Sequence, residues 1–174
     1  TDQTEYQRQM ALLAGYIPSE FSGGSHLEYW EDTFGYDAFD LNQEIMIQSL
    51  SQPNTSQPLL SVMKGNFDAN RIIEKLSGLG YQQKNYASIN YYSIRDDYQV
   101  DFGSSPARMS MAFLNRMLVN DREIIVAPAD DIFFSVLNVR KGEQSSLENS
   151  LAYTSVSEAL GDILGAALIP RSQL

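Results

Sequence analysis

The sequence predicts an α+β fold in which helices cover an antiparallel sheet. Residues 59–94 have the pattern of a strand, a helix and a second strand. Residues 109–127 are typical of two strands joined by a short turn, and a helical pattern follows over 128–140. The two halves share no residue motif, so they are related arrangements and not a sequence repeat.

The front of the chain is predicted to contain a helix, a short strand and a second helix. The first helix covers 4–14, which a Gly and a Pro follow. The strand covers 26–32, where three residues alternate onto one side: Leu27, Tyr29 and Glu31. The second helix covers 41–50, and three residues face inward: Leu41, Ile45 and Leu50. Residues 51–58 are polar, contain two prolines and form a linker.

The strand–helix–strand pattern comes next. Its first strand, 59–64, is apolar and ends at a Gly-Asn turn. Asp68 stands at the N-cap of the helix, where its carboxylate can accept backbone N–H groups of the first turn. An apolar stripe and two glycines that can end the helix follow: Ile72, Ile73 and Leu76, then Gly78 and Gly80. Residues 89–94 are β-branched and aromatic, which predicts the second strand.

The second half is predicted to begin with a hairpin. Strands at 109–119 and 123–127 are joined by a turn at 120–121. A helix follows over 128–140, because a proline is favourable in its first turn. Four of its residues are expected to be buried: Ile132, Phe133, Val136 and Leu137.

A helix at 155–164 and a strand at 165–169 complete a second strand–helix–strand order. This is the split βαβ arrangement of a ferredoxin-like sandwich, with an antiparallel sheet and helices on one face. The length of 174 residues suits a single domain over 1–174. In this domain an acidic, helical N-terminal segment at 1–58 packs on a ferredoxin-like core at 59–174.

Composition limits the classes of partner. The net charge is −10, which disfavours nucleic acid and anionic membrane surfaces as partners. The acidity is concentrated at the front, where residues 1–50 contain nine acidic residues against one basic residue. The absence of cysteine excludes disulfides, thiolate metal ligands and a cysteine nucleophile. No apolar run approaches the roughly 18–20 residues that a membrane-spanning helix needs.

Several turn and core residues follow one another in an order that resembles a known group of proteins. They are Gly65-Asn66-Phe67-Asp68, Leu76, Gly80-Tyr81, Tyr86 and Tyr91-Tyr92. The order is similar to that of uncharacterised ferredoxin-like domains in secreted or lipid-anchored proteins of bacterial and archaeal cell envelopes. The likeness covers about residues 59–140. It implies a ferredoxin-like fold and an extracytoplasmic location, with no known activity and no catalytic residues.

The most unusual stretch is 28–40, where acidic and aromatic side chains are mixed. Seven of its residues form a candidate ligand surface: Glu28, Tyr29, Trp30, Glu31, Asp32, Tyr36 and Asp37. Such a surface can hold a cationic ligand, or it can hydrolyse glycans with paired carboxylates while the rings stack on sugar. The carboxylates could also bind calcium weakly, although the spacing of an EF-hand loop is absent. The other interpretation is that the rings pack in the core and the acids are solvated.

The remaining polar residues show no catalytic pattern. His26 is the one histidine, and a zinc or iron site without thiolates normally needs more than one. Three acids occupy the loop after residue 94: Asp96, Asp97 and Asp101. Asp130 and Asp131 lie in a predicted first helical turn, where negative charge is favourable.

Together these observations predict a non-enzymatic extracytoplasmic domain that binds or scaffolds a protein or glycan partner in the cell envelope. No cofactor is expected apart from weakly bound calcium. One alternative is a carboxylate-dependent glycan hydrolase that uses residues 28–40, which needs two carboxyl groups about 5–10 Å apart across a cleft. The other alternative, by fold analogy, is a protease pro-domain or inhibitor that inserts its tail, 170–174, into the protease.

Overall fold

A computed structural model of the chain describes three stretches and three single residues: 27–48, 58–100, 113–146, Asn149, Leu151 and Thr154. The described residues fall into two compact units, one that ends at Phe133 and one that begins at Phe134. The last helix, α5, covers Asp130–Arg140 and therefore contributes its first turn to the first unit. No helix in the described stretches is long and apolar enough to cross a membrane.

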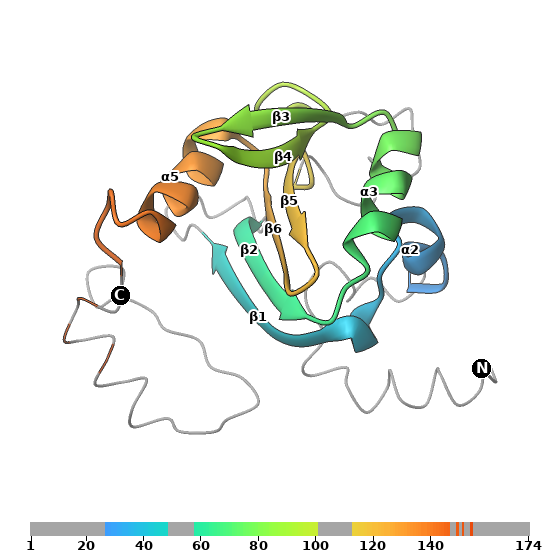
Figure 1. Cartoon of the computed structure of the whole chain (residues 1–174), viewed down its shortest axis with the longest axis horizontal. Helices are drawn as coiled ribbons and strands as arrows, with labels where there is room; N and C mark the ends of the chain where they lie inside the picture. The colour runs from blue at the N-terminus through green and yellow to red at the C-terminus, as the bar shows by residue number, and fades with distance from the viewer. Residues whose placement is uncertain are drawn as a thin grey trace. The chain divides into compact units, whose positions relative to one another are not determined.

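The first unit is built on one six-stranded antiparallel sheet (Figure 1). The strands lie in the order β1-β2-β6-β5-β4-β3, and every neighbouring pair is antiparallel. Their bounds are Leu41–Gln48 for β1, Pro58–Gly65 for β2, Gln82–Tyr86 for β3, Ile89–Ser93 for β4, Arg116–Asn120 for β5 and Glu123–Ala127 for β6. The predicted α+β class with an antiparallel sheet is therefore confirmed.

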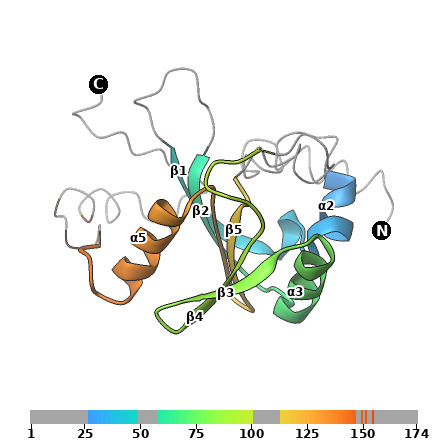
Figure 2. The same ribbon diagram turned by 90° about the horizontal axis from the view of Figure 1, so that it is seen from above.

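Along the sequence, helical segments lie before the first strand and between the second and third strands. They are α2 at Leu27–Phe34, a 3₁₀ turn at Ala38–Asp40 and α3 at Ala69–Gly78. The helices α2 and α3 lie side by side in both views (Figure 1, Figure 2). The helix α3 connects β2 to β3, which stand on opposite sides of the three strands β6, β5 and β4.

The helix α3 forms as its sequence predicts. The Asp68 carboxylate accepts the backbone N–H of Arg71 at 3.0 Å, which caps the first turn. Ile72 and Leu76 are fully buried on one side of the helix. The helix ends at Gly78, and the left-handed backbone angle that closes it belongs to Gly80, with a φ of +93°.

The core lies between α2, α3 and one face of the sheet. Strand pairing places Tyr92 opposite Met117 and Met117 opposite Val126, so these three side chains share a face. They belong to a cluster with residues from both helices and from the segment between α2 and β1. Its other main members are Trp30, Phe34, Tyr36, Met63, Phe67, Ile72, Leu76 and Ile124.

The opposite face of the sheet has its own buried residues. Leu118, Ile125 and Tyr91 point to that side by the alternation along their strands. The ring of Tyr91 lies 5.2 Å from that of Phe133, in the first turn of α5. The sequence predicted helices on one face. The predicted helix α3 lies on that face together with α2, whose residues were predicted as a strand, whereas the first turn of α5 contacts the other face.

The strand predicted at 26–32 is wrong, because residues Leu27–Phe34 form the helix α2. Trp30 and Phe34 are one helical turn apart, and both are fully buried. A helical period therefore buries two large rings, whereas a strand period would have grouped Tyr29 with Glu31.

The helix predicted at 41–50 is also wrong, because Leu41–Gln48 form the strand β1. β1 pairs with β2 along its length, with Ile45 opposite Val62 and Ile47 opposite Leu60. Ile45, expected to face inward on a helix, is 51% exposed. Pairing with the apolar β2 decides the structure here, against a local spacing that also fits a helix.

The strand β3 was not predicted, because its residues are polar and almost all exposed. It forms a hairpin with β4 through Ala87 and Ser88, whose φ angles of 49° and 68° are those of a two-residue type I′ turn. The predicted hairpin of the second half is confirmed at 123–127, but β5 begins only at Arg116. Likewise α5 begins at Asp130, two residues after its predicted start, and buries Phe133 and Leu137.

Three predicted elements lie outside the described residues: the helices at 4–14 and 155–164 and the strand at 165–169. The last of these is needed to complete the second half of a ferredoxin-like order. The finer ferredoxin-like assignment therefore stays a prediction. In the second unit, Leu137 is buried and the Lys141 ammonium forms an ion pair with Glu143.

Candidate functional site

The residues predicted to form one ligand surface do not lie together: some are buried in the core and others are at the protein surface. The side chains of Trp30 and Tyr36 are fully buried, with their ring centres 6.1 Å apart in an edge-to-face arrangement. Trp30 also packs on Phe34 at 4.6 Å, and Tyr36 packs on Phe67 at 5.9 Å. These rings hold α2 against the core, so they offer no surface on which a ligand can stack.

The acids of the same stretch have separate positions. Glu31 accepts a hydrogen bond from Arg71 at 2.7 Å, and this contact raises the pKa of Arg71. Asp37 caps the 3₁₀ turn by accepting the backbone N–H groups of Phe39 and Asp40 at 2.7 and 3.2 Å. Burial is the main cause that raises the pKa of Asp37. The side chains of Glu28 and Tyr29 lie outside the described part of the chain.

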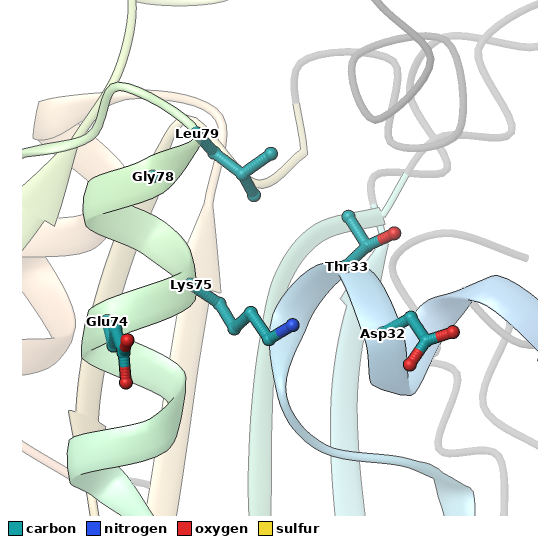
Figure 3. A pocket seen from close by; sticks show the side chains of 6 residues that line it. All are labelled: Asp32, Thr33, Glu74, Lys75, Gly78 and Leu79. Atoms are coloured by element: carbon teal, nitrogen blue, oxygen red, sulfur yellow. The ribbon is translucent and has the colours of Figure 1, made fainter.

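Asp32 lies at an open groove between the last turns of α2 and α3 (Figure 3). The groove has a volume of about 420 Å³. Its lining residues are Asp32 and Thr33 from α2 and Glu74, Lys75, Gly78 and Leu79 from α3.

The Lys75 side chain extends from α3 toward α2 across this groove (Figure 3). A cation is favourable there, because Lys75 belongs to the last turn of α3, where the helix dipole is negative. The groove thus presents an ammonium group and two carboxylates to solvent. Water screens such exposed charges, so the groove can hold a small charged molecule only weakly.

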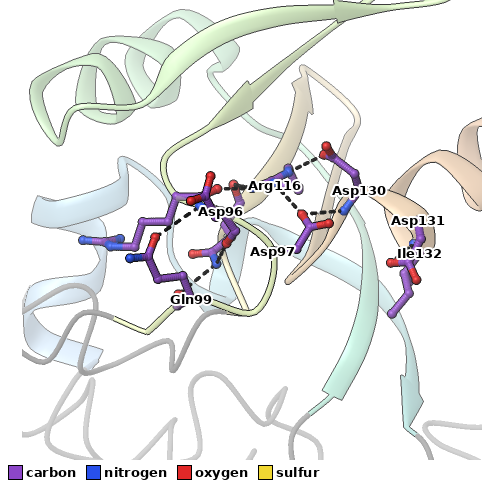
Figure 4. Close-up of polar contacts among 9 residues, drawn as sticks. Asp96, Asp97, Gln99, Arg116, Asp130, Asp131 and Ile132 are labelled. Atoms are coloured by element: carbon purple, nitrogen blue, oxygen red, sulfur yellow. Dashed lines mark hydrogen bonds and ion pairs between the residues drawn. The ribbon is translucent and has the colours of Figure 1, made fainter.

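A second cluster of charges surrounds Arg116 at the start of β5 (Figure 4). The Arg116 side chain is only 3% exposed, and its guanidinium donates to the carboxylates of Asp97 and Asp130. It also donates to the backbone carbonyl of Arg95 at 2.6 Å. The Asp97 carboxylate in turn accepts the backbone N–H of Asp130 at 3.0 Å. The buried charge is therefore neutralised, and the cluster fixes the loop after β4 to the first turn of α5.

The two acids around Arg116 belong to the two acidic groups that the sequence shows outside residues 28–40, the loop after residue 94 and the first turn of the predicted helix. Because Asp97 and Asp130 neutralise an arginine, they are structural partners rather than open ligands. Asp101 lies outside the described residues. Within the described stretches, no three histidine or acidic side chains gather in a way that could hold a metal ion.

Among the described residues, β1 carries two exposed large apolar side chains on one face, and the sequence did not predict this surface. Ile45 and Ile47 are 51% and 45% exposed, and they point to the same face because they are two residues apart on a strand. β1 is an edge of the sheet as described, with β2 as its one neighbour. Ile45, Met46 and Ile47 are three apolar residues in a row, so the sequence shows no alternation that would mark one exposed face.

Arg116 was also missed, although a signal for it was present. It is a single cation within the stretch Phe113–Val119, which is apolar apart from Arg116 and the neighbouring Asn115. A charge buried in such a stretch requires acidic partners. Among the residues that the structure describes, two places suit a partner: the groove between α2 and α3, and the edge strand β1. Function must be inferred from these places, because the chain matches no protein-family model, no curated protein and no solved structure.

Proposed function

We propose that this chain is a non-enzymatic binding module of the cell envelope that takes up an extended segment of a partner protein along β1. The observation that carries the proposal is the exposure of Ile45 and Ile47 on one face of an edge strand. An edge strand can pair with a further strand, and pockets or apolar rows beside it then select the side chains of that strand. The extracytoplasmic location is supported by the resemblance of residues 59–140 to envelope domains.

The two edges of the sheet differ in a way that favours β1. The other edge, β3, has five residues, is polar and contains Lys84, all of which protect an edge strand against pairing. β1 has eight residues, contains no lysine, arginine or proline, and exposes two isoleucines. Covering the exposed half of each isoleucine contributes about 1 kcal/mol to binding.

A ferredoxin-like core belongs to this proposal. It is supported by the β2–α3–β3 connection, in which a helix joins two strands that other strands separate. The glycan-hydrolase alternative gains no support from the described geometry, since Glu31 and Asp37 have structural partners and Trp30 is buried.

The test uses a fluorescent ten-residue peptide in which valine alternates with threonine, measured by fluorescence anisotropy. We expect the wild-type protein to bind this peptide and to bind much less of a version with prolines at two central positions, since proline cannot pair as a strand. Ile45→Lys should weaken binding about tenfold or more. Gln83→Lys, which makes a similar change on β3, should alter binding less than about twofold.

Two results would overturn the proposal. One is equal binding of the valine–threonine and the proline peptides, because pairing of backbone groups would then play no part. The other is an equal effect of Ile45→Lys and Gln83→Lys, because β1 would then have no special role.

A further inference from the structure

This inference rests on the proposed function and concerns the chemistry of the partner. We propose that the segment that pairs with β1 alternates apolar residues with lysine or arginine. Its apolar side chains cover Ile45 and Ile47, and its basic side chains lie on the other face beside Glu44.

The two faces of β1 differ in character. Ile45 and Ile47 lie on one face, and Glu44 and Met46 lie on the other because each is one residue away from Ile45. Glu44 is half-buried, and the hydroxyl of the fully buried Ser61 donates a hydrogen bond to its carboxylate. A side chain held in this way presents its negative charge at a fixed place beside the edge.

A strand that pairs with β1 must repeat the period of two that β1 shows. Residues across from the isoleucines gain from being apolar. The residues on the other face of the segment lie across from Glu44 and Met46, where a long basic side chain can reach the Glu44 carboxylate directly or diagonally. An opposite charge at such a cross-strand position favours pairing by roughly two- to fivefold, and a like charge disfavours it. The geometry therefore selects an alternating apolar and basic segment.

The charge of the surrounding chain supports the same partner. Residues 27–48 contain no lysine or arginine but six acids: Glu28, Glu31, Asp32, Asp37, Asp40 and Glu44. Lys64 of β2 lies across from Gln43 and is the basic residue of that strand. A second copy of this chain carries the same excess of acids, so pairing of β1 with itself would bring like charges together. A basic partner segment is favoured instead.

The experiment compares three ten-residue peptides that place threonine, lysine or glutamate between the valines. In low salt we expect the valine–lysine peptide to bind about two- to fivefold tighter than the valine–threonine peptide, and the valine–glutamate peptide to bind weakest. Glu44→Gln keeps an oxygen that accepts from Ser61 and removes the charge. It should reduce the preference for lysine at least twofold and leave the binding of the valine–threonine peptide within about twofold.

Glu74→Gln is the matched control, because it removes one exposed acid from α3 and should not change the preference. Equal affinity for all three peptides, with Ile45→Lys still weakening each, would overturn the charge inference and leave strand pairing intact. Absence of binding by every peptide would overturn the proposed function itself. Tighter binding of the lysine peptide that Ile45→Lys does not weaken would also overturn the inference, because it would reflect a general attraction of the basic peptide to an acidic protein. A dimer seen by light scattering and lost on Ile45→Lys would replace the basic partner with a second copy.

Discussion

Ile45 of β1 lies directly across from Val62 of β2, yet 51% of Ile45 is exposed because β1 is an edge of the sheet. The same cross-strand row continues through Ile125, which is fully buried. One row of apolar side chains thus passes from the core to an open edge. This relationship is the basis for the proposed partner site.

The row predicts a gradient in stability. Ile125→Ala should lower the free energy of unfolding by about 2–5 kcal/mol, as is usual for a buried isoleucine. Ile45→Ala should lower it by less than about 1 kcal/mol, because half of the side chain is already in water. Urea unfolding monitored by circular dichroism measures both values. Equal losses would mean that Ile45 belongs to the core, which contradicts its role as a surface for a partner.

The cluster around Arg116 predicts a second difference. Asp97→Ala removes one of the two carboxylates that neutralise a buried guanidinium, together with the acceptor for the Asp130 N–H. We expect a loss of about 1–3 kcal/mol in the free energy of unfolding, less than for a fully buried pair because Asp97 is half exposed. Asp96→Ala is the matched control and should cost less than about 0.5 kcal/mol. If the two variants unfold alike in urea, the Arg116 cluster does not stabilise the fold.

Two glycines should respond in opposite directions to alanine. A Cβ at Gly65 would collide with the backbone carbonyl of Asp40, whose oxygen accepts the N–H of Asn66 at 2.9 Å. Gly65→Ala should therefore destabilise by about 1–3 kcal/mol. A Cβ at Gly78 meets open space in the last turn of α3, so Gly78→Ala should stabilise by about 0.5–1 kcal/mol. Thermal midpoints that fall for both variants would contradict this description of α3.

Tyr81 predicts a loss of stability at alkaline pH. Its hydroxyl is buried and donates to the carbonyl of Leu114 at 2.7 Å, and burial raises its pKa well above the usual value. Between the unfolded pKa of about 10 and the higher folded pKa, the folded chain holds a proton that the unfolded chain releases, so the stability falls as pH rises.

Tyr81→Phe should cost about 1 kcal/mol at pH 7 through the lost hydrogen bond. The variant should also lose less stability than the wild type when the pH rises from 9 to 11. Denaturant titrations at several pH values measure this difference. Parallel curves for the two proteins would show that Tyr81 does not titrate with unfolding.

The sequence predicted best those elements whose signals are local. The helix α3 has an N-cap at Asp68, an apolar stripe at Ile72 and Leu76, and a left-handed residue at Gly80, and each acts through neighbouring residues. The strands β2 and β6 are mostly apolar, with Ser61, Lys64 and Glu123 as exceptions, and both lie inside the sheet with a neighbour on each side.

The sequence-based predictions were wrong for elements whose secondary structure is determined by contacts between residues distant in the chain. Residues 27–34 fit a strand period and a helix period, and burial of Trp30 and Phe34 in the core selects the helix. Residues 41–48 fit both as well, and pairing with β2 selects the strand. The polar strand β3 shows no alternation of apolar and polar residues, because both faces of this edge strand are exposed to solvent and neither packs against the core.

The candidate site shows the same limit. Exposure of Ile45 and Ile47 depends on the position of β1 in the sheet, which no local pattern contains. The acidic and aromatic stretch 28–40 attracted the functional interpretation, but its two largest rings are core residues. Of the five predicted residues whose side chains the structure describes, Asp32 lines the groove between α2 and α3.

The most direct test of the β1 site is backbone amide hydrogen exchange, measured with and without saturating valine–lysine peptide. Pairing of the peptide with β1 should slow the exchange of amides within residues 41–48 and leave those within 82–86 unchanged. Ile45→Lys should strongly reduce this protection at a peptide concentration near the wild-type dissociation constant. Protection that appears around α2 and α3 instead, or equally at both edges of the sheet, would contradict the account.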